Sequence, residues 1–394
     1  MIKVASKHGG TLKKCIEVLK TYGEIYGADG FVECTSCHFV TSCGLRFVKS
    51  MFSILQELHE AELRCKGPLT ANPRPLDSKV YPLLEKIAGK LLYGKQKKLE
   101  NLLLDLGLID RDAFTCTPYY IGNKPKYGEV LAWAESSAVI YANSVLGART
   151  NRNSSIIEII SGVLGKTPRF GLLIDENRKA DWLIEVKTSA RPNPFVLGAL
   201  IGKIVVDGVP YITGLDRWDY KEYELKDMGA AAAAWGAVAL FHAEGLTPEA
   251  VEKSRALLKD DHSKLVVDDA KLYEMMKIMA SRKEKKFDLA VIGCPHLSRE
   301  QLEDWAKKVE GLKLKVKTWF LAAPGIAKEF KASKMYATLK EAGADVISVC
   351  PLMFTNIPTS KRLSIITSSA KLSYYSHASY AGEHEIIEII AERR

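Results

Sequence analysis

FDLAVIGC, at residues 287–294, is a short apolar segment rich in β-forming residues. Two more segments of this kind follow it, LKLKVKTWF (312–320) and ADVISVC (344–350). Helical patterns separate the three: SREQLEDWAKKVE (298–310), whose serine and glutamine are spaced as in a capping box, and PGIAKEFKASKMYATLKEAGA (324–344). The alternation of strands and helices predicts a parallel sheet covered by helices, and therefore an α/β fold.

Cysteines stand at the ends of two of these predicted strands. Cys294 and Cys350 both fall at the carboxyl end of a parallel strand, which is the edge where open α/β sheets bind their ligands. Cys116, in TCTPYY, shares with them a loop context and a proline one or two residues later. We interpret the three cysteines as one candidate site. Buried thiols that serve only the packing are the alternative.

The chain alternates in a similar way upstream of this region. We expect a helix over 48–62, a long apolar helix over GEVLAWAESSAVIYANSVLGA (128–148) and a strand over RFGLLID (169–175). The most apolar window, MGAAAAAWGAVALFHA (228–243), is shorter than the roughly 20 residues that cross a bilayer. We therefore expect it to be a buried helix.

The composition is that of a globular chain. Its 394 residues are 47% hydrophobic and 26% charged, which excludes a disordered protein, a coiled coil and a small disulfide scaffold. The length predicts two to three domains. We place an N-terminal α/β region at 1–280, made of two subdomains and carrying Cys116. A C-terminal α/β domain at 281–394 carries Cys294 and Cys350.

The net charge of +9 is spread along the chain and is accompanied by no nucleic-acid-binding signature. We therefore predict neither a nucleic-acid partner nor a membrane partner, and a positive balance suits an enzyme that attracts anionic substrates. The N-terminus, MIKVASKHGG, has no apolar signal core, so we expect a cytoplasmic protein. Gly198, Gly202 and Lys203 lack the spacing of a phosphate-binding loop, and no dinucleotide fingerprint follows a strand.

A second, local group of possible metal ligands lies in ECTSCHFVTSC (33–43), which supplies Cys34, Cys37, His38 and Cys43. Structural zinc sites combine two ligand pairs, and the chain has no second CxxC. We interpret these as buried or loop thiols, with a zinc site as the alternative. The histidines beside glycine, cysteine or proline are interpreted as structural: His8, His38 and His296.

Several stretches, taken in order, resemble the large-subunit region of the aconitase X family. They are GEIYGAD (23–29), a TxNP pattern with a later acid (Thr70, Asn72, Pro73, Asp77), TCTPYYIGNKPKYGE (115–129), AWAESSAVIYANSVLGARTNR (132–152), LLIDENR (172–178), GCPHLS (293–298) and CPLMFTN with TSSAK (350–371). The resemblance covers nearly the whole chain. It implies the three-layer α/β/α core of aconitase with parallel sheets, without the swivelling domain.

The resemblance also implies an activity and a cofactor. Members of the superfamily are hydro-lyases that bind an iron–sulfur cluster through three cysteines, and the matching positions here are Cys116, Cys294 and Cys350. We expect a [4Fe–4S] cluster, with a mononuclear iron or a smaller cluster left open. The serine base of the superfamily lies on the swivelling domain. We therefore expect a separate small subunit in a heterodimer or a dimer of heterodimers, and an inactive isolated chain.

Two substrates fit the resemblance. Archaeal members dehydrate (R)-mevalonate 5-phosphate to trans-anhydromevalonate 5-phosphate in the mevalonate pathway of isoprenoid synthesis, and we expect that reaction here, with this phosphorylated hydroxy acid as substrate. Other members dehydrate cis-3-hydroxy-L-proline, which is the alternative. A protein of a different class, a zinc-binding scaffold or nucleic-acid-binding protein, would use the cysteines of ECTSCHFVTSC (33–43) instead.

Substrate contacts are expected from polar residues of the matching stretches and from one loop. The candidates are Thr41, Ser42, Asn72, Pro73, Glu135, Ser136, Ser137, Arg149, Arg152 and Lys371. Arg149 and Arg152 are candidate clamps for a phosphate or carboxylate, because a guanidinium binds oxyanions through two parallel hydrogen bonds. Surface salt bridges are the alternative for both arginines.

Overall fold

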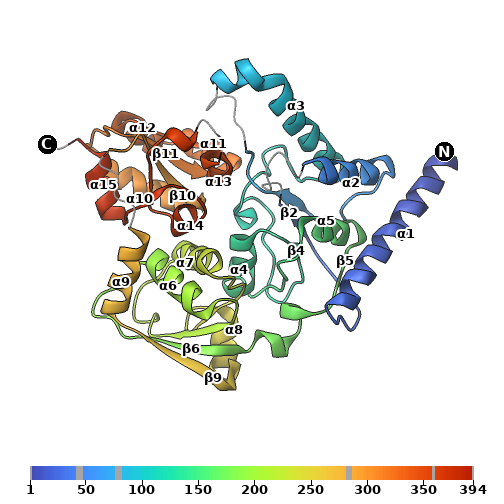
Figure 1. Cartoon of the computed structure of the whole chain (residues 1–394), viewed down its shortest axis with the longest axis horizontal. Coiled ribbons are helices and arrows are strands. Elements are labelled where there is room, and N and C mark those ends of the chain that lie inside the picture. Colours follow the sequence, from blue (N-terminus) through green and yellow to red (C-terminus); the bar gives the residue numbers. More distant parts are fainter. Residues whose placement is uncertain (1, 41–47, 76–81, 281–285, 357–359, 393–394) are drawn as a thin grey trace.

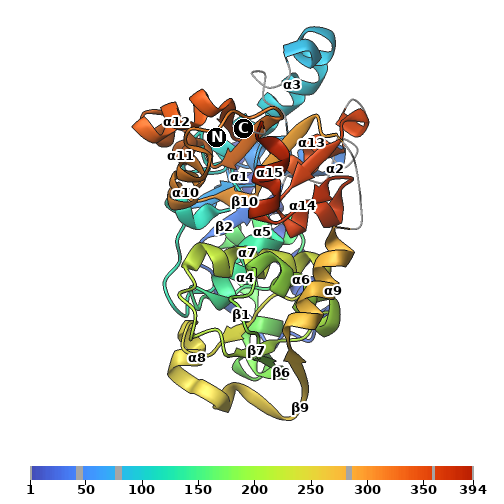
Figure 2. The ribbon, with the colours of Figure 1, turned by 90° about the vertical axis from the view of Figure 1, so that its left-hand side faces the viewer.

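A computed structural model describes residues 2–40, 48–75, 82–280, 286–356 and 360–392. They form three α/β lobes that follow one another along the chain, the first at 2–174, the second at 175–280 and the third at 286–392 (Figure 1). The sheets of the second and third lobes lie at opposite ends of this part of the molecule, with helices between them (Figure 2).

The first lobe is built on a small parallel sheet of order β3-β2-β4, next to an antiparallel pair, β1 and β5. Every residue of β2 and β3 is buried, because helices such as α5 cover this sheet. The elements are α1 (Ile2–Ile25), β1 (Phe31–Glu33), β2 (Cys37–Phe39), α2 (Val48–Glu60), β3 (Leu69–Ala71), α3 (Pro82–Asp105), η1 (Pro118–Tyr120), β4 (Ala132–Trp133), α4 (Ser136–Ser144), α5 (Ser155–Leu164), β5 (Lys166–Pro168) and η2 (Gly171–Leu173).

The second lobe has a parallel sheet of order β8-β7-β6-β9. Its helix α7 contacts α6, α4 of the first lobe and α14 of the third, and therefore lies at the centre of the molecule. The elements are η3 (Asp175–Arg178), β6 (Ala180–Val186), α6 (Pro194–Val205), β7 (Pro210–Thr213), α7 (Glu222–Trp235), β8 (His242–Ala243), α8 (Pro248–Lys253), η4 (Ser254–Leu257), β9 (Leu258–Val267) and α9 (Asp269–Met279).

The third lobe contains the predicted parallel sheet, in the order β12-β11-β10-β13-β14. Ser298 caps α10 and forms the predicted capping box with Gln301. The elements are β10 (Leu289–Leu297), α10 (Arg299–Val309), β11 (Lys317–Ala322), α11 (Pro324–Lys331), α12 (Lys334–Ala342), β12 (Ala344–Ile347), α13 (Pro351–Thr355), η5 (Ser360–Arg362), β13 (Ile365–Thr367), α14 (Ala370–Tyr375), β14 (Ser379–Tyr380) and α15 (Glu383–Ile390).

Helices cover both faces of this third sheet. Alternate residues of β10 point to opposite faces, as in any strand. Ala290 and Ile292 pack into one apolar cluster with residues of α10, α12 and α15, whereas Leu289 and Val291 pack into another with residues of α13 and α14. The expected α/β fold with parallel sheets and helices on both faces is therefore confirmed.

Three predicted elements are wrong in extent or type. The predicted helix over 128–148 is a strand, β4, followed by α4, because the Glu135 carboxylate accepts the Ala138 N–H and starts the helix there. The predicted strand over 169–175 contains the 3-10 turn η2, where Gly171 has a φ of +56°. The predicted helix over 228–243 ends at Trp235 and is followed by β8.

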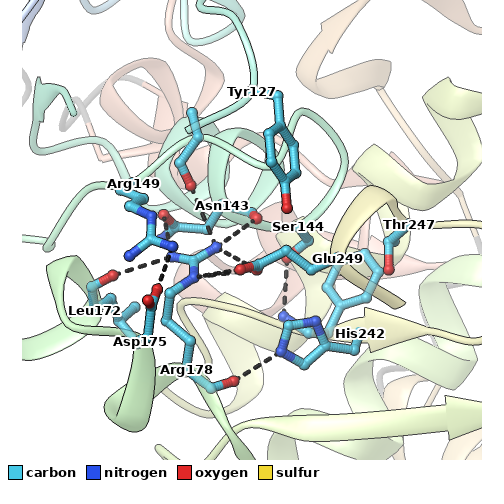
Figure 3. Close-up of polar contacts among 12 residues, drawn as sticks. Tyr127, Asn143, Ser144, Arg149, Leu172, Asp175, Arg178, His242, Thr247 and Glu249 are labelled. Carbon is cyan, nitrogen blue, oxygen red and sulfur yellow. Dashed lines mark hydrogen bonds and ion pairs between the residues drawn. The ribbon is translucent and has the colours of Figure 1, made fainter. Parts of the chain in front are cut away.

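A buried ion pair of the second lobe lies against the end of α4 in the first lobe (Figure 3). The Arg178 guanidinium donates to Glu249 Oε2 over 2.6 Å, and both side chains are almost completely buried. The same guanidinium also donates to the Asn143 carbonyl, at the end of α4. The Nε2 of His242 contacts the Arg178 carbonyl over 2.8 Å. These contacts fix η3 and α8 against the first lobe.

The described helices include none that is both long and apolar enough to cross a lipid bilayer. The part of the apolar window that lies in α7 instead packs closely against α6. An added Cβ on Gly198 of α6 would come within 2.1 Å of the Met228 carbonyl oxygen of α7. Gly198 therefore permits the close approach of two buried helices, which explains a glycine that has no phosphate-loop context.

Gly198→Ala is expected to lower the free energy of unfolding by about 1–3 kcal/mol, because the added methyl group forces α6 and α7 apart. Denaturant titration measures the change. Gly325→Ala is the matched control, since an added Cβ in α11 meets no atom within 4 Å. Equal stability of the two variants would contradict this account of the helix contact.

Candidate active site

The carboxyl ends of two parallel sheets face each other between the first and third lobes. In the first lobe, Asn72 follows β3 and Glu135 follows β4 by two residues. In the third lobe, Cys294 lies in the second half of β10, and Lys371 comes four residues after β13. Such edges are where parallel α/β sheets bind ligands, so the two lobes present their binding edges to one another.

A buried ion pair connects these two edges. Lys371 Nζ donates to Glu135 Oε1 over 2.5 Å, although the residues are 236 positions apart, and they are only 4% and 6% exposed. Burial alone raises the pKa of Glu135 and lowers that of Lys371. Burial is the largest single influence on both groups, but the partner's charge and the surrounding hydrogen bonds and charges together outweigh it, so the pKa of Glu135 falls below its usual value and that of Lys371 rises. Both groups are therefore charged.

Two serines complete the surroundings of the Lys371 ammonium group. It donates to Ser136 Oγ and to Ser137 Oγ, each over 3.1 Å, while Ser137 Oγ donates to Glu135 Oε2 over 2.7 Å. All three protons of the ammonium group are thus used within this cluster. Ser136 is the most exposed of the four residues and therefore marks the side from which a ligand would reach Lys371.

The three predicted cysteines lie on segments that the same lobe contact brings together. Cys116 Sγ accepts the backbone N–H of His296, over 3.2 Å. The Cys350 N–H donates to the Arg74 carbonyl over 2.9 Å, which places the Cys350 loop beside the segment after β3. The Cys294 carbonyl accepts a hydrogen bond from Ser369 Oγ, two residues before Lys371.

The pKa values of the three thiols are shifted by burial and by nearby charged groups. Burial is the main reason why all three have a raised pKa, which reaches about 12 for Cys116. The pKa of Cys294 is raised further by Cys116 and Cys350, whereas Lys371 lowers the pKa of every one of the three. The thiols are thus close enough to influence one another, and Lys371 is the cation that favours their ionised form.

A buried histidine orients Asn72. His38 Nδ1 lies 2.8 Å from Thr70 Oγ1, and Nε2 lies 3.0 Å from Asn72 Oδ1. Asn123 Nδ2 donates to Thr70 Oγ1 over 2.9 Å. Burial lowers the pKa of His38 to about 4, so the ring is neutral and bridges β2 and β3 without adding charge. Pro73, the next candidate, is buried beside Asn72.

The other expected contacts lie elsewhere or outside the described residues. Arg149 forms an ion pair with Asp175 and donates to the Leu173 carbonyl, at the junction of the first and second lobes. Arg152 donates to the Ala237 carbonyl. Thr41 and Ser42 lie outside the described residues. The structure therefore brings Glu135, Ser136, Ser137 and Lys371 together, and gives the two arginines protein partners at another place.

Sequence reasoning did not identify several polar residues that support the site. Thr115, Asn123 and Lys226 were not singled out, and His38 and His296 were interpreted as structural. The only local signal for the two histidines is position, since His38 is the middle residue of a short strand and His296 follows Cys294 by two residues. Their importance comes from contacts between distant segments, and a single sequence does not contain that information.

The second group of cysteines forms buried thiols beside α5. Cys34 Sγ donates to the Ser161 carbonyl over 3.4 Å, and Cys37 Sγ donates to the Glu158 carbonyl over 3.3 Å. Cys43 lies outside the described residues. In the part of the chain that the structure describes, no group of three or more His, Cys, Asp or Glu side chains is arranged as a metal site.

Comparison with known proteins assigns the chain to a family. Residues 3–176, 176–277 and 287–388 match the first, second and third domains of aconitase X, respectively. The chain belongs to the aconitase X family. A crystal structure of aconitase X from Thermococcus kodakaraensis, in its holo-form, superposes with a TM-score of 0.83 at 29% identity, covering 97% of this chain and 96% of that one.

The relatives with named activities are dehydratases. The phosphomevalonate dehydratase large subunits of Methanocaldococcus jannaschii and Methanosarcina mazei are 32% and 33% identical, covering 94% and 93% of this chain and 92% and 88% of those proteins. The cis-3-hydroxy-L-proline dehydratase of Pseudomonas aeruginosa is 28% identical over 95% of this chain and 65% of its own length. This aconitase X chain is therefore a hydro-lyase, as the resemblance implied.

Lys371→Met is expected to lower the free energy of unfolding by about 3–5 kcal/mol, because it leaves the buried Glu135 carboxylate without its counter-charge. Adding Glu135→Gln to this variant should restore much of the loss, since the unpaired charge is then removed. Denaturant unfolding of the parent, the single variant and the double variant measures both effects. A single variant within about 1 kcal/mol of the parent would show that the pair is hydrated.

Proposed function

We propose that this chain is the large catalytic subunit of an iron–sulfur hydro-lyase that converts (R)-mevalonate 5-phosphate into trans-anhydromevalonate 5-phosphate. The observation that carries the proposal is that hydrogen bonds bring the segments of three buried cysteines and the Lys371–Glu135 pair to the place where two sheet edges face each other. The names of the relatives that match most of their own length support the substrate.

The three cysteines fit an iron–sulfur group by their donor chemistry. Thiolates are the ligands of iron–sulfur clusters, and the three thiols are buried, mutually interacting and influenced by one cation. We propose Cys116, Cys294 and Cys350 as the ligands of a [4Fe–4S] cluster. A cluster held by three thiolates leaves one iron position open, and such an iron supplies Lewis acidity toward a carboxylate or hydroxyl oxygen.

The chain's own residues bind and orient the substrate in this proposal. Lys371 carries the positive charge that attracts an oxyanion, and the half-buried Ser136 is the partner that a substrate oxygen replaces. Glu135 keeps Lys371 charged and in place, because its Oε1 accepts from Lys371 while its Oε2 is held by the Ser137 hydroxyl and the Ala138 N–H. Asn72, held by His38, presents an amide at the end of β3, in the same sheet. Water is largely excluded, which strengthens each of these contacts.

Two features favour the phosphorylated substrate over cis-3-hydroxy-L-proline. The chain spans about two thirds of the length of the hydroxyproline dehydratase relative and about nine tenths of the phosphomevalonate dehydratase large subunits. The net charge of +9 also favours a dianionic substrate over a small zwitterion. We further propose a small-subunit partner that brings the serine base, since the relatives are themselves named large subunits.

The ligand assignment predicts the effect of single substitutions. Cys116→Ser, Cys294→Ser and Cys350→Ser should each lose the cluster, because a hydroxyl is a much harder ligand for iron than a thiolate. Cys34→Ser and Cys37→Ser are the matched controls, since these thiols are equally buried but lie beside α5. Iron and acid-labile sulfide are measured after anaerobic reconstitution. Full retention in any of the first three removes that cysteine from the ligand set.

Turnover by the reconstituted complex tests the substrate. We expect the complex with a small subunit to dehydrate mevalonate 5-phosphate, and the chain alone to show no turnover. Unphosphorylated mevalonate should have a kcat/KM lower by a factor of about thirty or more, because losing a charge-assisted contact to a buried oxyanion costs roughly 2–5 kcal/mol. Equal kcat/KM for the two would exclude a phosphate contact, and preference for cis-3-hydroxy-L-proline would assign the alternative reaction.

Arg149→Ala in the same complex tests the arginine clamp. The side chain pairs with Asp175 at the junction of two lobes, so we expect the same preference for the phosphorylated substrate as in the parent. A phosphate preference that disappears in this variant alone would place Arg149 at the substrate after all. The ratio of the two kcat/KM values is the quantity to compare.

A further inference from the structure

His296 is a completely buried residue of β10 whose backbone N–H and both ring nitrogens contact the cysteine segments. Its backbone N–H donates to Cys116 Sγ over 3.2 Å. Its ring Nδ1 lies 3.0 Å from Oγ1 of Thr115, the residue before Cys116. Its ring Nε2 lies 3.3 Å from the carbonyl oxygen of Val349, the residue before Cys350. His296 itself follows Cys294 by two residues, so one side chain connects all three segments.

The direction of these hydrogen bonds follows from the chemistry of the partners. The Val349 carbonyl only accepts, so Nε2 carries the proton and donates. With the ring proton on Nε2, Nδ1 accepts from the Thr115 hydroxyl, which has a proton to donate. Thr115 Oγ1 also accepts the Thr117 N–H, over 3.1 Å. The residues on both sides of Cys116 are therefore tied to one imidazole of defined tautomer.

A lysine from the second lobe fixes the backbone of the same residue. Lys226 Nζ, on α7, donates to the His296 carbonyl over 3.0 Å and to Gln301 Oε1 over 2.7 Å, and it is completely buried. His296 is thus held by α7 on one side and holds the cysteine segments on the other. All three lobes meet through this residue.

We propose that His296 is a positioning residue that sets the relative placement of Cys116, Cys294 and Cys350 for binding the iron–sulfur group. This inference rests on the proposed ligand set. The physical reason is that three ligands on separate loops must keep a fixed spacing, and side chains that bond to ligand segments orient them as outer-shell partners do in other metal sites. A histidine that served only the packing of the core would not need hydrogen bonds to the residues before two of the three cysteines.

Three substitutions separate the two ring contacts. His296→Leu removes both. His296→Gln keeps an N–H near the Nε2 position for the Val349 carbonyl, and His296→Asn keeps an oxygen near the Nδ1 position for Thr115. His242→Leu is the matched control, because His242 is equally buried and its ring contacts the Arg178 carbonyl, in a network without cysteines.

The experiment compares how tightly each reconstituted protein holds iron. Iron and sulfide content, the visible and paramagnetic spectra of the cluster, and the rate of iron loss to a chelator are measured beside thermal unfolding of the metal-free proteins. We expect His296→Leu to hold iron on the order of 10–100-fold more weakly, with smaller losses for His296→Gln and His296→Asn. The His242→Leu protein should unfold at a lower temperature and yet hold iron as the parent does.

The outcomes distinguish this inference from the proposed function. Parent-like iron retention and spectra in His296→Leu, with iron lost in Cys116→Ser, would overturn the positioning role and leave the ligand set standing. Equal weakening of iron binding in His242→Leu and His296→Leu would also overturn it, because the effect would then follow general destabilisation. Iron retained in Cys116→Ser would overturn the ligand set, and the positioning role with it.

Discussion

The buried ion pair between Lys371 and Glu135 is the constraint on which the candidate site depends. Taking two charges out of water costs free energy, and their attraction recovers it only when the geometry is good and the remaining hydrogen-bonding positions are filled. The two serines and the Ala138 N–H, in the first turn of α4, fill them here. Because the partners belong to different lobes, this requirement fixes how the sheet edges of the first and third lobes face each other.

The same burial shapes the chemistry of the thiols. A low-dielectric site disfavours thiolates, and the pKa of each of the three cysteines is raised for that reason. Lys371 is a positive charge that opposes this effect, and it remains charged because Glu135 lies beside it. One buried pair therefore serves two roles, keeping a cation near the thiols and leaving the site neutral enough to exclude water.

Sequence patterns predicted correctly those parts of the fold that depend on interactions between neighbouring residues. The capping box at Ser298 formed as expected, because both of its hydrogen bonds lie within four residues. The strand pattern placed Cys294 and Cys350 at one sheet edge, because the alternation of strand and helix patterns is carried by neighbouring residues. The helix over 128–148 was wrong because an apolar run suits a buried strand as well as a helix, and the Glu135 carboxylate decided where the helix began.

The sequence by itself determined the α/β class, the family resemblance and the candidate cysteines, since strand periodicity, caps and motifs are carried by neighbouring residues. Only the tertiary structure decided which polar groups became partners. Arg149 forms an ion pair with Asp175, and Lys371 forms one with Glu135. The His296 ring lies between Thr115 and Val349. Such pairings join residues tens to hundreds of positions apart, and they depend on how whole lobes pack, which no local pattern records.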